Sequence, residues 1–199
     1  ESHSMSAPLP RRDILKAGIS ATALASVLPL LVASQTAFAG SSQTVTATAG
    51  MAKALRSIGG NVCLEAAIRL EGFSDDAERF SLHLRQAGLD QADARRLAAA
   101  LSAFEPQKIS AITSFSVSFN PDIGDAGAKV IANALPTKLP ELGLVGCDIG
   151  DQAGDALLRW ALRAPNLHTM CIEGNRFSDR LQARFAELGR QRPDMLLVI

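Results

Sequence analysis

The sequence predicts an α/β protein built from short units of one strand and one helix, and two periodic signals indicate this fold class. Prolines that would end a helix recur at intervals of 30, 29 and 28 residues, at Pro106, Pro136, Pro165 and Pro193. An apolar residue followed by Gly-Asp or Ser-Asp recurs at intervals of 26 and 28 residues, at 123–125, 149–151 and 177–179. We expect the Asp or Ser of each triplet to cap the helix that follows it.

A short segment of alternating apolar residues precedes each of these triplets. In a strand, such alternation places the apolar side chains on one face, so each segment predicts a strand. We expect the Asn or Cys that follows each segment to turn inward, where an Asn side chain can satisfy backbone groups of the adjacent turn. The segments run Phe115-x-Val117 to Asn120, Leu142-x-Leu144 to Cys147, and Met170-x-Ile172 to Asn175.

Each triplet is followed by apolar residues at helical spacing, which predicts a helix with one buried face. One strand and one helix therefore recur with a period of about 28 residues, a spacing typical of repeat proteins. The predicted buried faces are Ala128, Ile131, Ala132 and Leu135; Ala153, Leu157, Trp160 and Ala161; and Leu181, Phe185 and Leu188.

Leu139 and Leu167 lie three residues before Leu142 and Met170, which completes the pattern L-x-x-L-x-L-x-x-N/C in two of the units. On this pattern, residues 80–199 resemble the ribonuclease-inhibitor class of leucine-rich repeats. The resemblance implies a short α/β solenoid, with parallel strands on the concave side and helices on the convex side, and we assign residues 61–199 to it. The chain departs from the family pattern where an extra residue in Pro121-Asp122 precedes the helix.

The segment before Pro106 allows two interpretations. Leu82-x-Leu84, followed by Leu89-Asp90, has the register of a further strand, whereas the apolar spacing also fits a helix over residues 75–86. We prefer the strand, followed by a helix over residues 94–101. We expect residues 51–72 to form an irregular N-terminal cap with a strand near 68–70, and the apolar residues 195–199 to form an edge strand.

Residues 5–39 have the order of an export signal. A twin arginine precedes an apolar run over residues 17–33, and the small side chains that signal peptidase requires stand at Ala37 and Ala39. The segment resembles twin-arginine signal peptides, with departures at Pro10 and Ile14, which implies export of the folded chain to the periplasm. The positions that match the family pattern are Arg11, Arg12, Leu15 and Lys16.

The apolar run is 17 residues long, at the short end of the ~17–25 residues that span a bilayer. We prefer cleavage after Ala39, and the alternative is an uncleaved tether, in which only residues 14–39 contact the cytoplasmic membrane. We interpret the four residues before Met5 as an addition to the natural sequence. Residues 40–60 begin with a small, polar, uncharged stretch, which predicts a flexible linker.

Composition and motifs argue against several function classes. The 20 Lys and Arg balance the 20 Asp and Glu, so the chain has no net charge to attract nucleic acid. The sequence shows no Gly-rich phosphate loop, Ser-His-Asp arrangement or set of metal-binding histidines, so we expect no enzyme activity, no cofactor and no metal. His168 and Cys171 would lie on opposite faces of one strand, and we do not expect the inward Cys147 to pair with Cys171.

The strand residues that point away from the core form the candidate binding face, because repeat solenoids bind partners on the concave side. We therefore expect a non-catalytic protein-binding module, as an accessory or scaffold subunit of an envelope or membrane complex. The alternatives are a periplasmic small-molecule binder and a subunit that supports a partner redox enzyme. The candidate contacts are Ser114, Ser116, Ser118, Glu141, Gly143, Val145, Thr169, Cys171 and Glu173, then Leu197 and Ile199 of the edge strand, and His83 and Arg85 if residues 82–84 form a strand.

Overall fold

The computed structural model describes residues 47–73, 79–105 and 111–199, all within one unit of the chain, Gly40–Ile199. The expected export signal and membrane tether, residues 5–39, lie outside the described residues, and so do the signal residues Arg11, Arg12, Leu15, Lys16, Ala37 and Ala39. Within the described part of the chain, no helix is long and apolar enough to cross a membrane.

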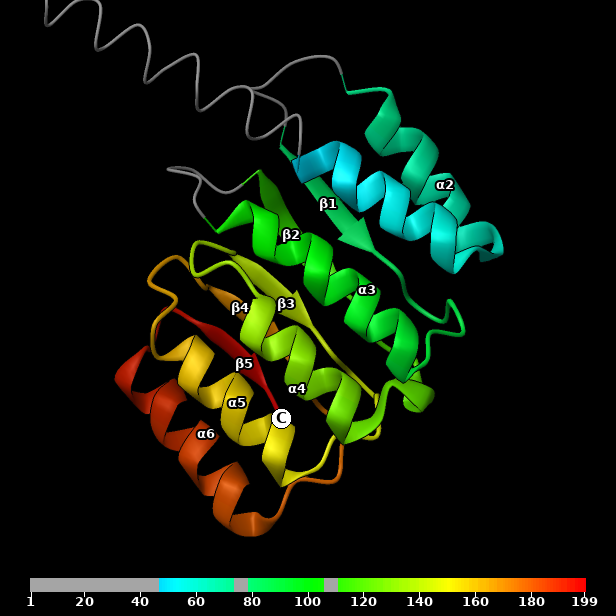
Figure 1. The fold of residues 1–199 in the computed structure, drawn as a ribbon. Helices are drawn as coiled ribbons and strands as arrows, with labels where there is room; N and C mark the ends of the chain where they lie inside the picture. The colour runs from blue at the N-terminus through cyan, green and yellow to red at the C-terminus, as the bar shows by residue number, and fades with distance from the viewer. Residues whose placement is uncertain (1–46, 74–78, 106–110) are drawn as a thin grey trace, which may run out of the picture. The chain divides into compact units, whose positions relative to one another are not determined.

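Five parallel strands form one sheet, in the order in which they occur along the chain (Figure 1). The strands expected from alternation are confirmed, including the one before Pro106 and the C-terminal edge strand. Residues 74–78, which the competing helix would include, lie outside the described residues. The strands are β1 (Phe80–His83), β2 (Ile112–Ser116), β3 (Glu141–Gly143), β4 (Thr169–Cys171) and β5 (Leu196–Val198).

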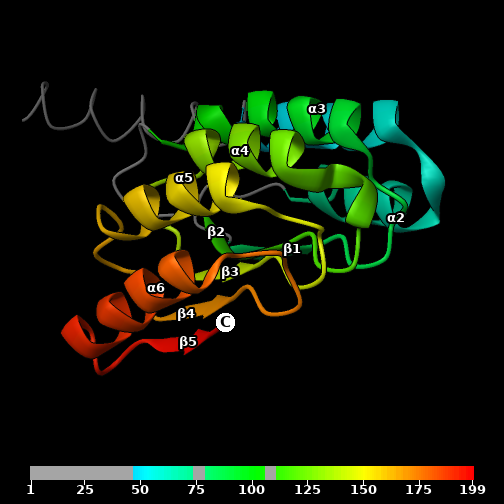
Figure 2. The ribbon, with the colours of Figure 1, turned by 90° about the horizontal axis from the view of Figure 1, so that it is seen from below.

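A helix follows each of the first four strands, and these four helices lie on the same face of the sheet (Figure 2). The predicted α/β class, with parallel strands in one layer and helices in another, is therefore confirmed. The helices are α3 (Gln91–Leu101), α4 (Gly124–Ala134), α5 (Asp151–Ala161) and α6 (Asp179–Gln191), with short 3-10 turns η1 (Ser102–Phe104) and η2 (Pro121–Ile123).

The core lies between the sheet and these helices. Phe115, Leu142 and Met170 occupy equivalent positions on neighbouring strands, and all three are buried. Every residue of the three predicted helix faces is also buried, with Trp160 and Phe185 among the largest fully enclosed side chains. The alternation of the strands and the helical spacing therefore converge on one apolar layer, which stabilises the fold by removing these side chains from water.

The N-terminal part of the unit differs from the expected linker and irregular cap. A helix occupies residues 47–58, and α2 (Gly60–Glu71) stands where a strand near residues 68–70 was expected. Arg56 donates hydrogen bonds of 2.6 and 2.5 Å to Glu71, which link the two helices. The linker prediction is wrong for residues 47–58 because small side chains at helical spacing are buried there; the two helices bury Ala47, Met51, Ala52, Leu55, Cys63, Ala66, Ala67 and Leu70.

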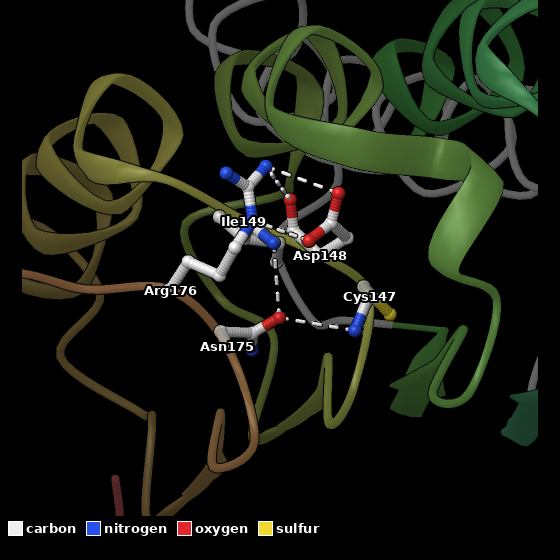
Figure 3. Close-up of polar contacts among 5 residues, drawn as sticks. All are labelled: Cys147, Asp148, Ile149, Asn175 and Arg176. Atoms are coloured by element: carbon white, nitrogen blue, oxygen red, sulfur yellow. Dashed lines mark hydrogen bonds and ion pairs between the residues drawn. The ribbon is translucent and has the colours of Figure 1, made fainter.

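Inward asparagine side chains hydrogen-bond consecutive turns of the chain, as expected. The Asn175 Oδ1 atom accepts from the backbone N–H groups of Cys147 and Ile149 at 3.0 and 3.1 Å, bonds that Figure 3 shows as dashed lines. The Asn175 Nδ2 atom donates to the Leu144 carbonyl at 2.8 Å. One amide thus satisfies backbone groups that the preceding turn would otherwise leave unpaired. On the surface beside it, Arg176 forms an ion pair with Asp148 that also joins the two turns.

Cys147 occupies the asparagine position of its unit and is buried, as expected. Its thiol donates to the Val117 carbonyl at 3.3 Å. A thiol is a weak acceptor and cannot replace an amide oxygen that receives two N–H groups. In the turn that Cys147 faces, the Ile123 N–H corresponds to the Ile149 N–H that Asn175 bonds. It donates instead to the Asn120 carbonyl at 3.2 Å, so this group does not require the thiol as an acceptor.

The expectation that the Asp or Ser of each triplet caps its own helix is correct for Ser178 and wrong for the two aspartates. The Ser178 hydroxyl accepts from the Leu181 N–H of its own helix, as predicted. Asp125 and Asp151 instead lie inside the first turn of their helices and accept from the next helix start, at Ala153 N (3.0 Å) and Ser178 N (2.8 Å). These carboxylates therefore cap the neighbouring helix and tie successive units together.

Candidate functional site

The sheet face opposite α3 to α6 carries the candidate contacts, and we call it the outer face. Strand pairing sets its side chains in rows that cross the sheet. One row is Ser81, Ser114, Glu141, Thr169 and Leu196, and the next is His83, Ser116, Gly143, Cys171 and Val198. The predicted residues of the middle strands are therefore brought side by side, and the alternation along each strand extends the outer face to Ser118, Val145 and Glu173.

The half of the outer face on β1 and β2 is a network of hydroxyl groups. His83 Nε2 lies 2.9 Å from the Ser114 Oγ atom, and the Ser116 and Ser118 Oγ atoms lie 3.1 Å apart. The Ser118 Oγ atom also accepts from the Val145 N–H at 3.1 Å. Ser114 and Ser118 are only 8% and 3% exposed, which corrects their assignment as accessible contacts. Their short side chains bond within the sheet and remain below its surface.

Gly143 keeps the centre of the outer face free of a side chain. A Cβ atom at this position would lie 2.7 Å from the Ser116 Oγ atom and 3.2 Å from the Ser118 Oγ atom. Because real side chains do not approach so closely, any larger residue would displace Ser116. Glycine at this site therefore preserves the hydroxyl pair beside a partly buried stretch of backbone.

The half of the outer face on β3 and β4 is acidic. Burial, together with the negative charges of Glu173 and Glu141, raises the pKa of the Cys171 thiol above its ordinary value. The Glu173 Oε2 atom is buried and has no hydrogen-bond partner among the described residues. His168 Nε2 lies 3.9 Å from a Glu141 oxygen, on the exposed rim. A ligand or partner on this half of the outer face would therefore meet carboxylate groups and a protonated thiol.

The groups of the outer face can be compared with the arrangements that nucleophilic catalysis and metal binding require. A Ser-His pair acts as a nucleophile when a third group orients the imidazole and amide groups receive the developing oxyanion. His83 and Ser114 lie within a regular sheet, and none of the described carboxylates bonds to the second nitrogen of His83. The raised pKa of Cys171 also disfavours the reactive thiolate. Among the described residues, no three His, Cys, Asp or Glu side chains are placed to hold a metal ion. The three cysteines are all unpaired.

The edge strand β5 contributes different residues from those predicted. Leu196 and Val198 lie on the outer face, in line with Thr169 and Cys171. Leu197 points toward the helices and packs against the core, so its side chain lies on the opposite side of the sheet from the other candidate contacts. Ile199 follows the strand and is exposed, as expected. A one-residue shift in register exchanges the two faces of a strand, which is why the alternation alone did not settle this choice.

A stacked pair at the end of β1 and β2 was only partly foreseen. The Arg85 guanidinium lies 4.0 Å from the centre of the Phe119 ring, a cation–π contact. Phe119 has a φ of 60°, and glycines with positive φ stand at the equivalent positions of the next two turns, Gly146 and Gly174. The sequence gives one indication of this feature: Phe119, Gly146 and Gly174 each directly precede the inward Asn or Cys of their unit.

Comparison with known proteins gives no further guide to the site, because no family model matches the chain and no curated protein matches its sequence.

Proposed function

We propose that this chain is an exported, non-catalytic protein-binding module of the leucine-rich-repeat type, and that a protein partner occupies the outer face. The consensus positions, the regular units and the asparagine bonds between turns support the assignment to the ribonuclease-inhibitor-like class of solenoids. In such solenoids the sheet forms the surface that partners contact. The twin-arginine pattern supports a periplasmic location, released or tethered, and a role as accessory or scaffold subunit of an envelope complex.

The observation that carries this proposal is the Glu173 carboxylate on the outer face. Its Oε2 atom is buried and unpartnered within the described chain. A buried polar atom without a hydrogen bond costs about 1–3 kcal/mol, and more when it is charged. Because the Glu173 side chain as a whole is only partly buried, a change of its rotamer on binding would bring this oxygen to a donor of a protein partner, such as an arginine, lysine or backbone N–H, and remove that cost. The neighbouring Glu141 adds negative charge that favours a cationic donor.

A comparison of two charge-neutralising variants tests this proposal. Glu173→Gln keeps the shape of the side chain on the outer face, and Glu65→Gln makes the same chemical change on the exposed surface of α2. We expect the native chain and Glu65→Gln to co-purify with the same stoichiometric protein from gently solubilised envelopes. We expect Glu173→Gln to lose most of that protein, because the amide offers a weaker acceptor to a cationic donor.

The outcome can also contradict the proposal. Equal recovery of the partner by both variants would show that Glu173 does not contact the partner. The proposal that the outer face binds the partner would then lose its main support. Recovery of the chain with a small molecule and no protein, detected by native mass spectrometry, would replace protein binding by ligand binding. The intact mass from the same sample shows whether the chain begins at Gly40 or retains residues 5–39.

A further inference from the structure

Strand β5 forms one edge of the sheet, and its hydrogen bonds show which of its backbone groups face outward. The Leu196 N–H donates to the His168 carbonyl, and the Val198 carbonyl accepts from the Ile172 N–H, both at 2.8 Å. In a parallel strand, the N–H and C=O of one residue point to the same side, and the side alternates along the chain. The N–H and C=O of Leu197 therefore point away from β4, where no strand of the described chain pairs with them.

This edge lacks the usual features that keep sheets from pairing with other chains. Natural edge strands carry a lysine, a proline, a bulge or an inward charge. The segment 195–199 is Met-Leu-Leu-Val-Ile, without a charged side chain or a proline. Leu196 and Ile199 are 58% and 41% exposed, and they are two of the four large apolar side chains exposed in the described part of the chain. The edge therefore combines free backbone groups with exposed apolar side chains.

From these features we infer that β5 pairs antiparallel with β5 of a second copy of the chain, around a two-fold axis beside Leu197. The outward N–H and C=O of Leu197 then bond to those of the partner's Leu197, because a residue on the axis faces itself. Leu196 lies opposite the partner's Val198 on the outer face, so apolar side chains meet apolar side chains on both sides of the axis. The segment is self-complementary, and pairing makes one continuous sheet from the two copies.

The helix above β5 does not oppose this arrangement. Gly189 of α6 lies over the strand, where an added Cβ atom would be 3.6 Å from the Leu197 side chain. Two arginines of α6 are compensated by carboxylates of the same chain, since Arg190 pairs with Glu187 and Arg184 pairs with Asp155.

The inference concerns the sheet edge and is independent of the proposed function, which concerns the outer face. Its test is the oligomeric state of the full chain in a mild detergent, measured by sedimentation velocity over a range of concentrations. Leu196→Lys places a charge on each side of the two-fold axis, opposite the partner's Val198. Leu162→Lys is the matched control, because Leu162 is 59% exposed on the helix layer, close to the value for Leu196.

We expect a reversible dimer for the native chain and for Leu162→Lys. We expect Leu196→Lys to raise the dimer dissociation constant at least about 100-fold. At concentrations where both chains are monomeric its Tm should equal that of the native chain, since Leu196 is exposed in the single chain. Amide exchange of Leu197 gives a second measurement, protected in the dimer and fast in the variant. A monomeric native chain, a dimer unaffected by Leu196→Lys, or an edge occupied only by a different protein would each overturn the inference.

Discussion

Replacing Asn120 by alanine tests whether buried asparagine side chains hold consecutive turns of this fold together. Asn120 is 1% exposed. Its Oδ1 atom accepts from the Leu89 N–H at 3.0 Å, and its Nδ2 atom donates to the carbonyls of Leu84 at 2.9 Å and Val117 at 2.7 Å. Leu84 and Leu89 belong to the preceding turn. The substitution therefore removes hydrogen bonds from backbone groups of two different turns.

The structure sets the size of the expected effect. The Val117 carbonyl keeps a second donor, the Cys147 thiol at 3.3 Å. The Leu89 N–H and the Leu84 carbonyl lose the partner that Asn120 provides. An unsatisfied buried backbone group costs about 1–3 kcal/mol, so two such groups lower the free energy of unfolding by about 2–6 kcal/mol. This is a large fraction of the ~5–15 kcal/mol of a typical domain.

Equilibrium urea unfolding measures the effect, followed by far-UV circular dichroism and by the fluorescence of the buried Trp160. Asn61→Ala, on the exposed surface of α2, is the matched control and should change the free energy of unfolding by less than about 0.5 kcal/mol. Asn120→Cys copies the residue that Cys147 places at this position, and it should fall between the native chain and Asn120→Ala because the thiol retains a donor. A loss below about 1 kcal/mol for Asn120→Ala would show that the Asn120 side chain does not hold the two turns together.

Three further predictions concern packing, thiol chemistry and export. Gly154→Ala should lower the free energy of unfolding by about 1–3 kcal/mol, because its Cβ atom would lie 2.3 Å from a leucine methyl group. In the same urea experiment, Gly189→Ala should be neutral or stabilising, because the nearest atom would lie 3.6 Å from its Cβ atom. Alkylation of the native chain should modify the partly exposed Cys171 first, and its rate should keep rising with pH beyond the range of an ordinary thiol, since burial and two glutamates raise its pKa; mass spectrometry of the modified chain checks this. Arg11→Lys with Arg12→Lys should leave unprocessed precursor in the cytoplasm, as cell fractionation would show, and normal export would contradict the twin-arginine assignment.

The repeated units could be predicted because each carries several independent signals. A strand alternation, an inward Asn or Cys and a helical apolar stripe agree at Phe115, Asn120 and Ile131, and again in the next two units. Agreement between local patterns of different period leaves few alternative folds. The strand of the first unit followed from the same register, although its helix-like spacing allowed a competing interpretation.

The N-terminal helices could not be predicted from composition. Residues 40–50 consist of small and polar residues that are typical of linkers, yet Ala47 and Met51 begin a buried stripe that continues at Ala52 and Leu55. The alanines of this stripe add little to the local hydropathy, and the surrounding Ser, Thr and Gly are typical of linkers. The composition therefore predicted a linker instead of a helix. Burial of this stripe depends on tertiary packing, which local propensity does not report.

The placement of the candidate residues on one face of the sheet could be predicted in outline, but not the burial and orientation of each side chain. The alternation of side chains along each strand predicted that Ser116, Glu141 and Thr169 lie on the face away from the core. The strand pairing places them together on the outer face. The burial of Ser118 depends on a hydrogen bond to the next strand, and the inward orientation of Leu197 depends on the register of β5 against β4. Both features arise between strands that are distant in sequence, so no pattern within one strand reveals them.

Site-specific photo-crosslinking in living cells tests most directly whether the outer face is the surface that binds a protein partner. A photoreactive amino acid is placed at Ser116 or Thr169 on the outer face, and at Lys129 or Arg180 on the helix layer, in otherwise native chains. If the outer face binds the partner, the two outer-face positions crosslink to one and the same protein, and the two helix positions do not. Crosslinks to that protein from the helix positions alone would show that the partner binds elsewhere.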